Sequence, residues 1–242
     1  MMNQSDGTIK LIEDKPIGNV QLFLEDILSR GLNCKYILDV GANLSEWSRM
    51  AKAVFPEAIF YLIEPLAEME LNLKQFCEDF SGSKYFLNGA GAVEEKHFLT
   101  TWGDELAGAN CLVQENDYMK SINKQREIQM ITIDSLIDKK EMEIPELVKL
   151  DTQGFELEAL KGASRLFGNT EVFILETSLF EFTKGTPILS EVVLFMAERG
   201  YEIYDFPGFL RRPYDGAIGQ IDVCFVKRNG YLRASNAWAF KT

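Results

Sequence analysis

The sequence lacks any long hydrophobic run, and this absence limits where the protein can act. No stretch approaches the roughly 18 consecutive apolar residues expected of a membrane-spanning helix. The N-terminal region also lacks a basic segment followed by an apolar one, which is the pattern of an export signal. We therefore expect a soluble cytoplasmic protein that does not act at a membrane.

Cysteine and histidine are scarce. The four cysteines, Cys34, Cys77, Cys111 and Cys224, are scattered without a CxxC spacing, and His97 is the only histidine. We interpret the cysteines as small core side chains or as free thiols of a reducing compartment. His97 follows a charged turn, so we expect it on the surface rather than at a site of proton transfer.

Positive charge is in deficit, with 25 Lys and Arg residues against 37 Asp and Glu residues and a net charge of −12. Proteins that bind nucleic acid carry a basic patch or stripe, and the pair Arg211-Arg212 is too short to form one. We expect a small-molecule or glycan partner and neither a nucleic-acid nor a membrane partner. The sequence leaves the oligomeric state open.

Apolar residues are abundant, and they alternate between strand and helix patterns. The 242 residues are 46% hydrophobic, which is enough for the core of one α/β domain. Helices are predicted over 17–30, 44–55, 66–80, 156–167 and 187–199. Strands are predicted over 36–40, 59–63, 85–87, 96–101, 127–133, 148–150, 172–175, 201–206 and 221–227.

The same patterns predict the organisation of the chain. We expect an N-terminal extension and helix over 1–35, one domain over 36–230, and a tail over 231–242. Residues 96–133 are expected to be an insertion in which a polar loop over 104–123 separates two strands. A long loop is expected between the last two strands, which should be antiparallel to each other.

A strand-turn-helix pattern at residues 36–47 is the most informative feature. The apolar run Tyr36–Val40 contains Asp39 near its end, Gly41 forms the turn, and a helical pattern follows. The next predicted strand leads to Glu64, which lies 23 residues after Gly41. An acidic residue about 20 residues after such a turn is placed to bind the hydroxyls of a ribose. The spacing therefore predicts a cofactor that contains a nucleoside.

The glycines missing from this turn distinguish between candidate cofactors. A dinucleotide-binding turn needs several glycines so that backbone N–H groups can approach a pyrophosphate, but only Gly41 is present. Glu46, at the start of the following helix, would repel a phosphate. S-adenosylmethionine carries no phosphate, and its ammonium group is compatible with a nearby carboxylate. We predict S-adenosylmethionine, with an NAD-dependent oxidoreductase and a non-catalytic binding module as alternatives.

Polar or small side chains follow several predicted strands. They are Asp39 to Gly41, Glu64, Asn88 to Ala90, Asp151 to Gly154, and Glu176 to Ser178. Ligands of open parallel sheets bind beyond the carboxyl ends of the strands. Such residues also form ordinary turns and caps, but their recurrence at successive strand ends favours a binding site.

Residues 148–163 resemble the FkbM family of S-adenosylmethionine-dependent methyltransferases, because they read VKLDTQGFELEALKGA. In that family this strand commonly reads K-[IL]-D-x-[EQ]-G-x-E, followed by L-x-G-A. Further matching segments are LDVGAN at 38–43, IEP at 63–65, NGA at 88–90, TIDSLI at 132–137, ILE at 174–176 and QIDVCFV at 220–226. The resemblance thus covers about residues 36–228 in the correct order.

The resemblance implies an α/β fold with the Rossmann-like sheet of class I methyltransferases. That sheet is mostly parallel, ends in an antiparallel strand, and carries helices on both faces. The implied activity is O-methylation of a sugar or another small metabolite. The implied cofactor-binding residues are Asp39, Gly41, Ala42, Asn43, Glu64, Pro65, Asn88, Gly89 and Ala90. Of these, Asp39, Gly41 and Asn43 would hold the methionine part, Glu64 the ribose, and 88–90 the surroundings of the adenine.

Three carboxylates are candidates for the chemistry. Asp151 ends a central strand and is the predicted base that removes the proton of an acceptor hydroxyl. Glu156, at the start of the next helix, and Glu176, at the neighbouring strand end, are predicted to act with it. Together with Asp134 they could hold a hard cation, but we expect no metal. Glu156 can equally be a helix-start acid, and we expect Asp134 to be the N-cap of the turn after it.

The acceptor is expected to lie beneath two loops. One follows the strand at 96–101 and is predicted to cover the acceptor. The other joins the last two strands and emerges on the cofactor side, where its basic residues would select an acidic or glycosyl acceptor, or else form a solvated turn. The predicted substrate-binding residues are Trp102, Arg211, Arg212, Tyr214 and Asp222. Trp47, in the first helix after the glycine turn, is expected in the core.

Overall fold

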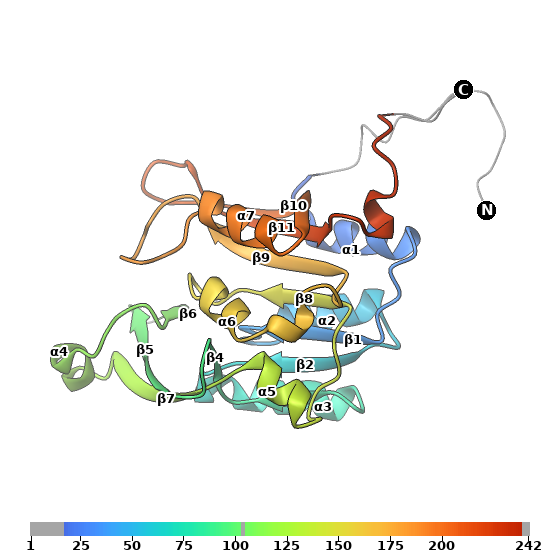
Figure 1. Cartoon of the computed structure of the whole chain (residues 1–242). Helices are drawn as coiled ribbons and strands as arrows, with labels where there is room; N and C mark the ends of the chain where they lie inside the picture. The colour runs from blue at the N-terminus through green and yellow to red at the C-terminus, as the bar shows by residue number, and fades with distance from the viewer. Residues whose placement is uncertain (1–16, 103–104, 239–242) are drawn as a thin grey trace.

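Seven strands form one sheet in the computed structural model, which describes residues 17–102 and 105–238, with only the backbone at 102 and 105–108. The strands are β1 (Tyr36–Val40), β2 (Ile59–Ile63), β3 (Lys84–Phe86), β8 (Leu147–Leu150), β9 (Val172–Ser178), β10 (Tyr201–Arg211) and β11 (Ile218–Lys227). Their order is β10-β11-β9-β8-β1-β2-β3 (Figure 1). The pairs β10–β11 and β11–β9 are antiparallel because β11 runs opposite to the other six strands, and the remaining pairs are parallel. This arrangement confirms the predicted fold.

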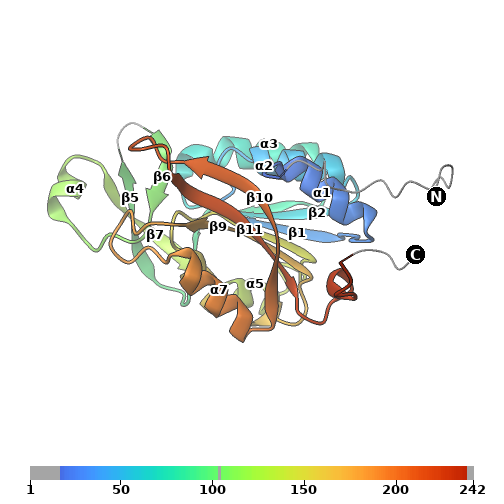
Figure 2. The ribbon, with the colours of Figure 1, turned by 90° about the horizontal axis from the view of Figure 1, so that it is seen from above.

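Helices cover both faces of the sheet (Figure 2). One face carries α1 (Val20–Ser29), α2 (Glu46–Val54), η2 (Ala67–Met69) and α3 (Glu70–Asp79). The other face carries α5 (Ile133–Asp138), α6 (Glu156–Lys161), η3 (Ser164–Leu166) and α7 (Leu189–Glu198), and η4 (Tyr231–Arg233) follows β11. No helix within the described ranges combines the length and the apolar character that crossing a membrane requires.

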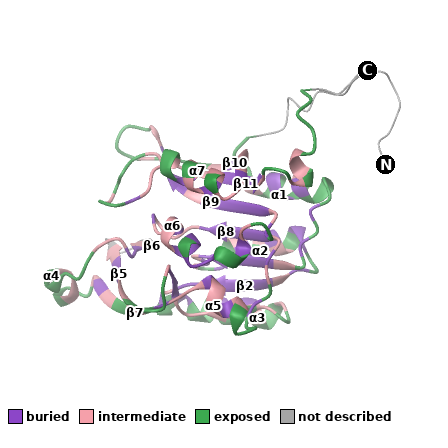
Figure 3. Ribbon diagram, in the orientation of Figure 1, coloured by how far each residue is buried: buried purple, intermediate pink, exposed green. Residues whose placement is uncertain are grey.

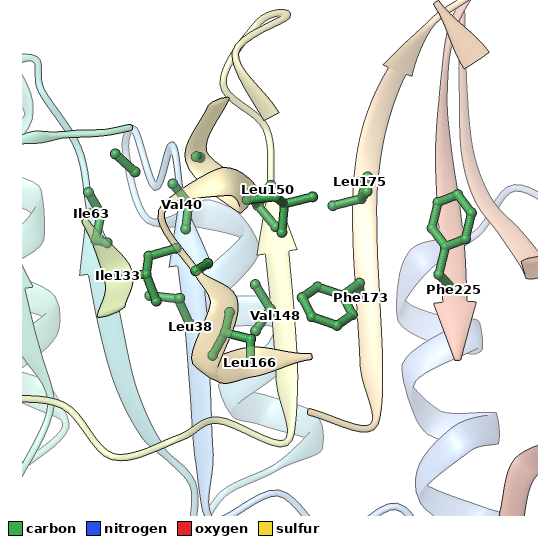
Figure 4. Packing of buried hydrophobic residues seen from close by; sticks show 14 of the residues in the cluster. Leu38, Val40, Ile63, Ile133, Val148, Leu150, Leu166, Phe173, Leu175 and Phe225 are labelled. Carbon is green, nitrogen blue, oxygen red and sulfur yellow. The ribbon is translucent and has the colours of Figure 1, made fainter. Parts of the chain in front are cut away.

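Side chains of the central strands alternate between two hydrophobic cores, one on each face. In β1, Ile37 belongs to the core beneath α1 and α2, whereas Leu38 belongs to the core beneath α5 and α6. Figure 4 shows this second core, where Phe173 of β9 lies beside Val148 of β8. Burial is concentrated in these strands (Figure 3). Strands covered on both faces are normally apolar throughout, which makes the buried Lys149 of β8 exceptional.

A smaller sheet lies at the end where the parallel strands finish (Figure 1). It consists of β4 (Gly89–Ala90), β5 (Lys96–Trp102), β6 (Glu105–Asn110) and β7 (Gln125–Ile131), in the order β4-β7-β5-β6. The expectation of a polar loop over 104–123 was wrong, because β6 and the helix α4 (Asp117–Ser121) occupy much of its described part. Strand β6 pairs with β5, and the Asn116 side chain caps α4 by accepting the Met119 N–H at 3.0 Å.

The last two strands are longer than predicted. β10 continues through Pro207 to Arg211, and β11 begins at Ile218 instead of Ile221. The pairing shifts register between Asp205 and Gly208, and such an irregularity accommodates a proline within a strand. The expected long loop is therefore a hairpin whose turn comprises residues 212–217.

The region around α5 and α6 also differs from the prediction. Thr132, not Asp134, is the N-cap of α5, because its side chain accepts the Ser135 N–H at 3.0 Å. The Asp134 carboxylate instead accepts the backbone N–H groups of Ser164 at 2.9 Å and Arg165 at 2.8 Å. The helix expected over 156–167 ends at Lys161 and is followed by the separate turn η3.

We expect that Phe173→Ala strongly destabilises the protein. Phe173 is fully buried, and its ring lies 4.9 Å from that of Tyr201 in an edge-to-face arrangement. Emptying such a site costs about 3–5 kcal/mol, which urea unfolding followed by circular dichroism would measure. Phe182, which is 51% exposed, provides the matched control, because Phe182→Ala should change stability by less than about 0.5 kcal/mol. Equal losses in the two variants would contradict the described core.

Candidate functional site

The carboxyl ends of the parallel strands open into a cavity of about 590 Å³, termed here the main cavity. Its floor comes from the ends of β1, β2, β8 and β9, and its walls include Leu99 and Met130 of the small sheet and Leu210 and Gln220 of the hairpin. The structure brings these predicted residues to its lining: Gly41, Ala42, Asn43, Glu64, Pro65, Gly89, Ala90, Asp151 and Glu176. The strand ends therefore converge on one site, as ligand binding in such sheets requires.

The turn after β1 is shaped by close contact with β2 and β8. The N–H groups of Gly41 and Ala42 donate to the Ile63 carbonyl at 2.8 and 3.2 Å. Gly41 has φ +80°, and a side chain there would overlap the backbone carbonyl of Asp151. Asn43 and Ser45 are also left-handed, with φ +44° and +63°. Non-glycine residues in this region are strained, and such strain is concentrated at functional sites.

Three buried polar atoms without a hydrogen-bond partner lie in the same segment. They are Asp39 Oδ1, Ser45 Oγ and Trp47 Nε1, and they are the complete set for the described residues. A buried unsatisfied group typically costs about 1–3 kcal/mol. Their concentration within residues 39–47, beside a strained turn, indicates a segment organised for binding rather than for stability.

Glu64 joins the first two strand ends. Its carboxylate accepts the Asn43 N–H at 2.8 Å and the Leu66 N–H at 2.9 Å. Burial raises the pKa of Glu64, and these two hydrogen bonds partly oppose that rise. Each carboxylate oxygen can accept a second hydrogen bond, so Glu64 can hold the turn and still bind the diol of a ribose.

Two predicted cofactor residues do not line the main cavity. Asp39 is fully buried, accepts the Ser48 hydroxyl at 2.6 Å, and lies 3.8 Å from Lys149 Nζ. Asn88 donates from its side chain to the Gln129 carbonyl at 3.2 Å and so ties the end of β3 to β7. Both residues therefore support the strand ends that form the lining without contacting the main cavity themselves.

A compact polar cluster lies where β8 and β9 end. Lys149 Nζ lies 3.1 Å from Asp151 Oδ2. The Gln153 amide donates to Asp151 Oδ1 and to Glu176 Oε2, both at 2.8 Å, and the Gln220 amide donates to the same Glu176 oxygen at 2.7 Å. Sequence reasoning missed Lys149, Gln153 and Gln220. The charged residue within the otherwise apolar run Val148–Leu150 was a signal for the first of them.

The two carboxyl groups of this cluster have opposite pKa shifts. Burial alone would raise the pKa of Asp151, but the adjacent Lys149 and the hydrogen bonds lower it below the ordinary value. Burial and the charge of Asp151 raise the pKa of Glu176 well above its ordinary value. Burial opposes the charge of Lys149, yet Asp151 and Asp39 raise its pKa. At neutral pH the cluster therefore contains an ionised Asp151 beside a protonated Glu176.

Glu156 is buried beneath the turn that follows β8 and does not reach the main cavity. Its Oε1 atom accepts the N–H of Thr152 at 2.8 Å, the hydroxyl of Thr152 at 3.1 Å, and the N–H of Gly154 at 3.1 Å. The structure therefore does not place Glu156 with Asp151 and Glu176 at the cavity surface. It gives Glu156 the position of a turn-stabilising residue.

The predicted arginines lie at the hairpin turn, outside the main cavity. Arg212 Nε donates to Asp215 at 2.7 Å, and its guanidinium lies 3.8 Å from the centre of the Phe180 ring. Arg211 donates to the Gly216 carbonyl at 2.7 Å, and Tyr214 is 90% exposed. These contacts agree with the alternative of a solvated turn.

The remaining predictions concern four residues. Asp222 is paired with Glu176 across β9 and β11 but lies outside the lining of the main cavity. The side chain of Trp102 falls outside the described part of the chain.

His97 is half-buried rather than exposed, and its Nε2 lies 2.9 Å from the Cys111 carbonyl oxygen. Trp47 packs against the core beneath α1 and α2, as expected, and it also lines the main cavity. Within the described residues, no group of three or more His, Cys, Asp or Glu side chains is arranged for a metal.

Comparison with known proteins identifies the family. The FkbM methyltransferase domain matches residues 39–203, which is more than half of the chain. The chain belongs to the FkbM methyltransferase family. This result confirms the resemblance found in the sequence, and the topology described above is the fold of S-adenosylmethionine-dependent methyltransferases. No curated protein matched the chain.

The comparison with solved structures found matches at low sequence identity. The FkbM methyltransferase of Methylobacillus flagellatus KT superimposes with a TM-score of 0.51 and 18% identity, over 78% of this chain and 43% of the other. This chain thus spans less than half the length of that relative. An rRNA methylase of Streptococcus thermophilus superimposes with a TM-score of 0.49 and 10% identity, over 88% of this chain and 98% of the other. The O-methyltransferase of tomaymycin synthesis from Streptomyces achromogenes was solved with S-adenosylmethionine. It superimposes with a TM-score of 0.49 and 9% identity, over 85% of this chain and 78% of the other.

We expect that Gly41→Ala impairs both stability and cofactor binding. The new methyl group would strain a backbone at φ +80° and collide with the Asp151 carbonyl. Gly168→Ala is the matched control, because Gly168 has φ +82° and nothing lies within 4 Å of the position of the added carbon. S-adenosylhomocysteine binding, measured by calorimetry, should fall by more than about tenfold in the first variant only. Equal binding by the two variants would show that the contact with β8 is unimportant.

Proposed function

We propose that this member of the FkbM family transfers a methyl group from S-adenosylmethionine to a hydroxyl of a sugar or another small molecule, with Asp151 as the base. The supporting observation is that Asp151 contacts Lys149 and shares the Gln153 amide with Glu176, at the end of the cavity that the cofactor turn also lines. This arrangement lowers the pKa of Asp151 and raises that of Glu176. Carboxyl groups whose environments push their pKa values apart are characteristic of acid–base sites.

The lining residues have the chemistry that S-adenosylmethionine requires. The turn at 41–43 would lie against the methionine part, and Glu64 would accept the ribose hydroxyls. Gly89 and Ala90, together with the apolar Leu99 and Met130, would form the surroundings of the adenine. No second glycine prepares the turn for a pyrophosphate. When bound, the cofactor supplies a methyl group that its sulfonium already activates.

The protein's own task is to remove a proton and to align the acceptor. Asp151 would take the hydroxyl proton as the new O–CH₃ bond forms and the S–CH₃ bond breaks. Lys149 keeps Asp151 ionised, and Gln153 fixes its orientation from the other side. Trp47, Phe155 and Leu210 line the same cavity and exclude water from it.

Cofactor choice provides the first experiment. Calorimetric titration should show binding of S-adenosylhomocysteine and no binding of NAD. Binding of NAD alone would favour the oxidoreductase and reject the proposal. Binding of S-adenosylhomocysteine without methyl transfer from labelled S-adenosylmethionine into the small-molecule fraction of a cell extract would favour a non-catalytic binding module.

We expect Asp151→Asn to lower turnover by about 10²–10⁴-fold, because an amide cannot accept the hydroxyl proton. The dissociation constant for S-adenosylhomocysteine should change by less than about tenfold. Labelled methyl transfer and calorimetry measure the two quantities. Asp138→Asn, at an exposed aspartate that pairs with Arg165, controls for the substitution itself. Turnover of Asp151→Asn near the control value would remove Asp151 as the base.

The raised pKa of Glu176 predicts how stability depends on pH. The folded protein holds the Glu176 proton more tightly than the unfolded chain, so this contribution is complete below the unfolded pKa of about 4.3 and is lost as pH rises towards the folded value. Glu176→Gln cannot ionise and should lose less stability than the wild type between about pH 5 and pH 8. Urea unfolding at both pH values measures the difference. Parallel losses would show that Glu176 is not protonated in the folded protein.

A further inference from the structure

A second cavity, of about 360 Å³, adjoins the main cavity. Asn110, Gln153 and Gln220 line both, and the remaining lining comes from Ser178 at the end of β9 and from Phe182, Thr183 and Thr186 in the connection to α7. The shared glutamines hold Glu176, and Gln153 also holds Asp151. A molecule in this second cavity would therefore contact the glutamines that hold Asp151 and Glu176.

The lining of the second cavity is uncharged throughout its described residues. It consists of three amides, three hydroxyls and one aromatic ring. The surroundings are different, since the chain carries a net charge of −12 and the main cavity contains Asp151, Glu176 and Lys149. The nearest arginine of the hairpin turn, Arg212, is occupied by Asp215 and by the Phe180 ring. No cationic side chain is among the described lining residues of the second cavity, and an anionic group buried there without a partner would be costly.

Two amide carbonyls and three hydroxyls of this lining are available to a ligand. The Gln153 and Gln220 amides use their N–H groups on the carboxyl cluster, which leaves their carbonyl oxygens as acceptors. The described structure contains no side-chain hydrogen bond from the Ser178, Thr183 or Thr186 hydroxyls. The hydroxyl groups of a ligand can donate hydrogen bonds to these carbonyl oxygens and can both donate to and accept from these side-chain hydroxyls.

Phe182 gives the cavity its apolar side. Its ring centre lies 5.8 Å from that of Phe180, and a side chain on Gly219 would meet the Phe182 ring at 3.2 Å. The glycine in β11 therefore makes room for the ring against the hairpin. The ring is nevertheless 51% exposed, so a ligand covering it would gain from burying apolar surface.

We propose that the second cavity binds the methyl acceptor and selects an uncharged polyhydroxylated group over phosphorylated or carboxylated ones. This inference rests on the proposed methyl transfer and narrows its substrate class. Of the acidic or glycosyl acceptor expected from Arg211 and Arg212, it keeps the glycosyl group and assigns its selection to other residues. The amide carbonyls and hydroxyls bind the acceptor's hydroxyl groups, Phe182 covers its apolar face, and one hydroxyl is thereby presented to Asp151.

The experiment uses the protein saturated with S-adenosylhomocysteine and a panel of methyl glycosides of neutral hexoses and deoxyhexoses, each with its matched uronate and 6-phosphate. Saturation-transfer NMR and calorimetry measure binding. We expect at least one neutral glycoside to bind more than about tenfold tighter than its charged counterparts. Equal or tighter binding of the charged members, or no binding of any neutral member, would overturn the inference.

Substitutions locate the binding to the second cavity. Phe182→Ala and Thr186→Val should each weaken binding of the neutral glycoside by about tenfold or more, whereas Tyr118→Ala, at an exposed aromatic residue of α4, should not. Thr183→Lys should improve binding of the matched uronate by supplying the missing cation. Unchanged affinity in the first two variants would place the acceptor elsewhere.

The controls separate this inference from the proposed function. Calorimetry with S-adenosylhomocysteine alone should give the wild-type affinity in all four variants. If the wild-type protein does not bind S-adenosylhomocysteine, the proposed methyl transfer itself is rejected. Intact cofactor binding and methyl transfer to a charged acceptor, unaffected by Phe182→Ala, would reject only the selection of an uncharged group.

Discussion

The site depends on one buried ammonium group. Lys149 is only 7% exposed, faces Asp39 across the pairing of β1 with β8, and lies 3.1 Å from Asp151. The three charges are tolerated because they compensate one another, and removing one partner of such a buried pair typically costs about 3–5 kcal/mol. The contact lies between β1 and β8, where the strand order reverses and where open α/β sheets bind their ligands. The contacts of Lys149 with Asp39 and Asp151 therefore connect the two central strands and also keep Asp151 ionised at the cavity.

The same ammonium makes two neighbouring carboxyl groups unequal. Asp151 and Glu176 share the Gln153 amide, so two negative charges would repel each other there. Of these two carboxyl groups, only Asp151 is in contact with Lys149, and this contact leaves the proton on Glu176. An ionised carboxylate is thereby available at neutral pH in the lining of the main cavity. The proposed chemistry needs this asymmetry, because a hydroxyl acceptor must lose a proton during methyl transfer.

The peripheral elements decide what the central sheet can act on. The small sheet and the β10–β11 hairpin both border the strand ends and contribute Asn110, Leu210 and Gln220 to the cavities. The sheet and its glycine turn belong to the family fold, whereas walls of this kind are where proteins of one fold differ in substrate. The uncharged second cavity combines Asn110 and Gln220 of these elements with Ser178 of β9 and with residues of the connection to α7. In the proposed function, this lining would select the acceptor.

The sequence by itself determined the frame of this protein, because each strand and turn is encoded in local patterns. Strands β1 and β2 were predicted at their observed bounds, and the acidic strand ends were correctly expected to meet since parallel strands share one edge. Strand β6 was missed because its alanine- and glycine-containing run has weak strand propensity. Only the tertiary structure decided that Lys149 contacts two carboxylates, that Glu156 holds a turn, and that Leu210 rather than Arg211 reaches the cavity. Those outcomes depend on which faces meet across strand pairings and crossovers, and that information is not carried by any single segment.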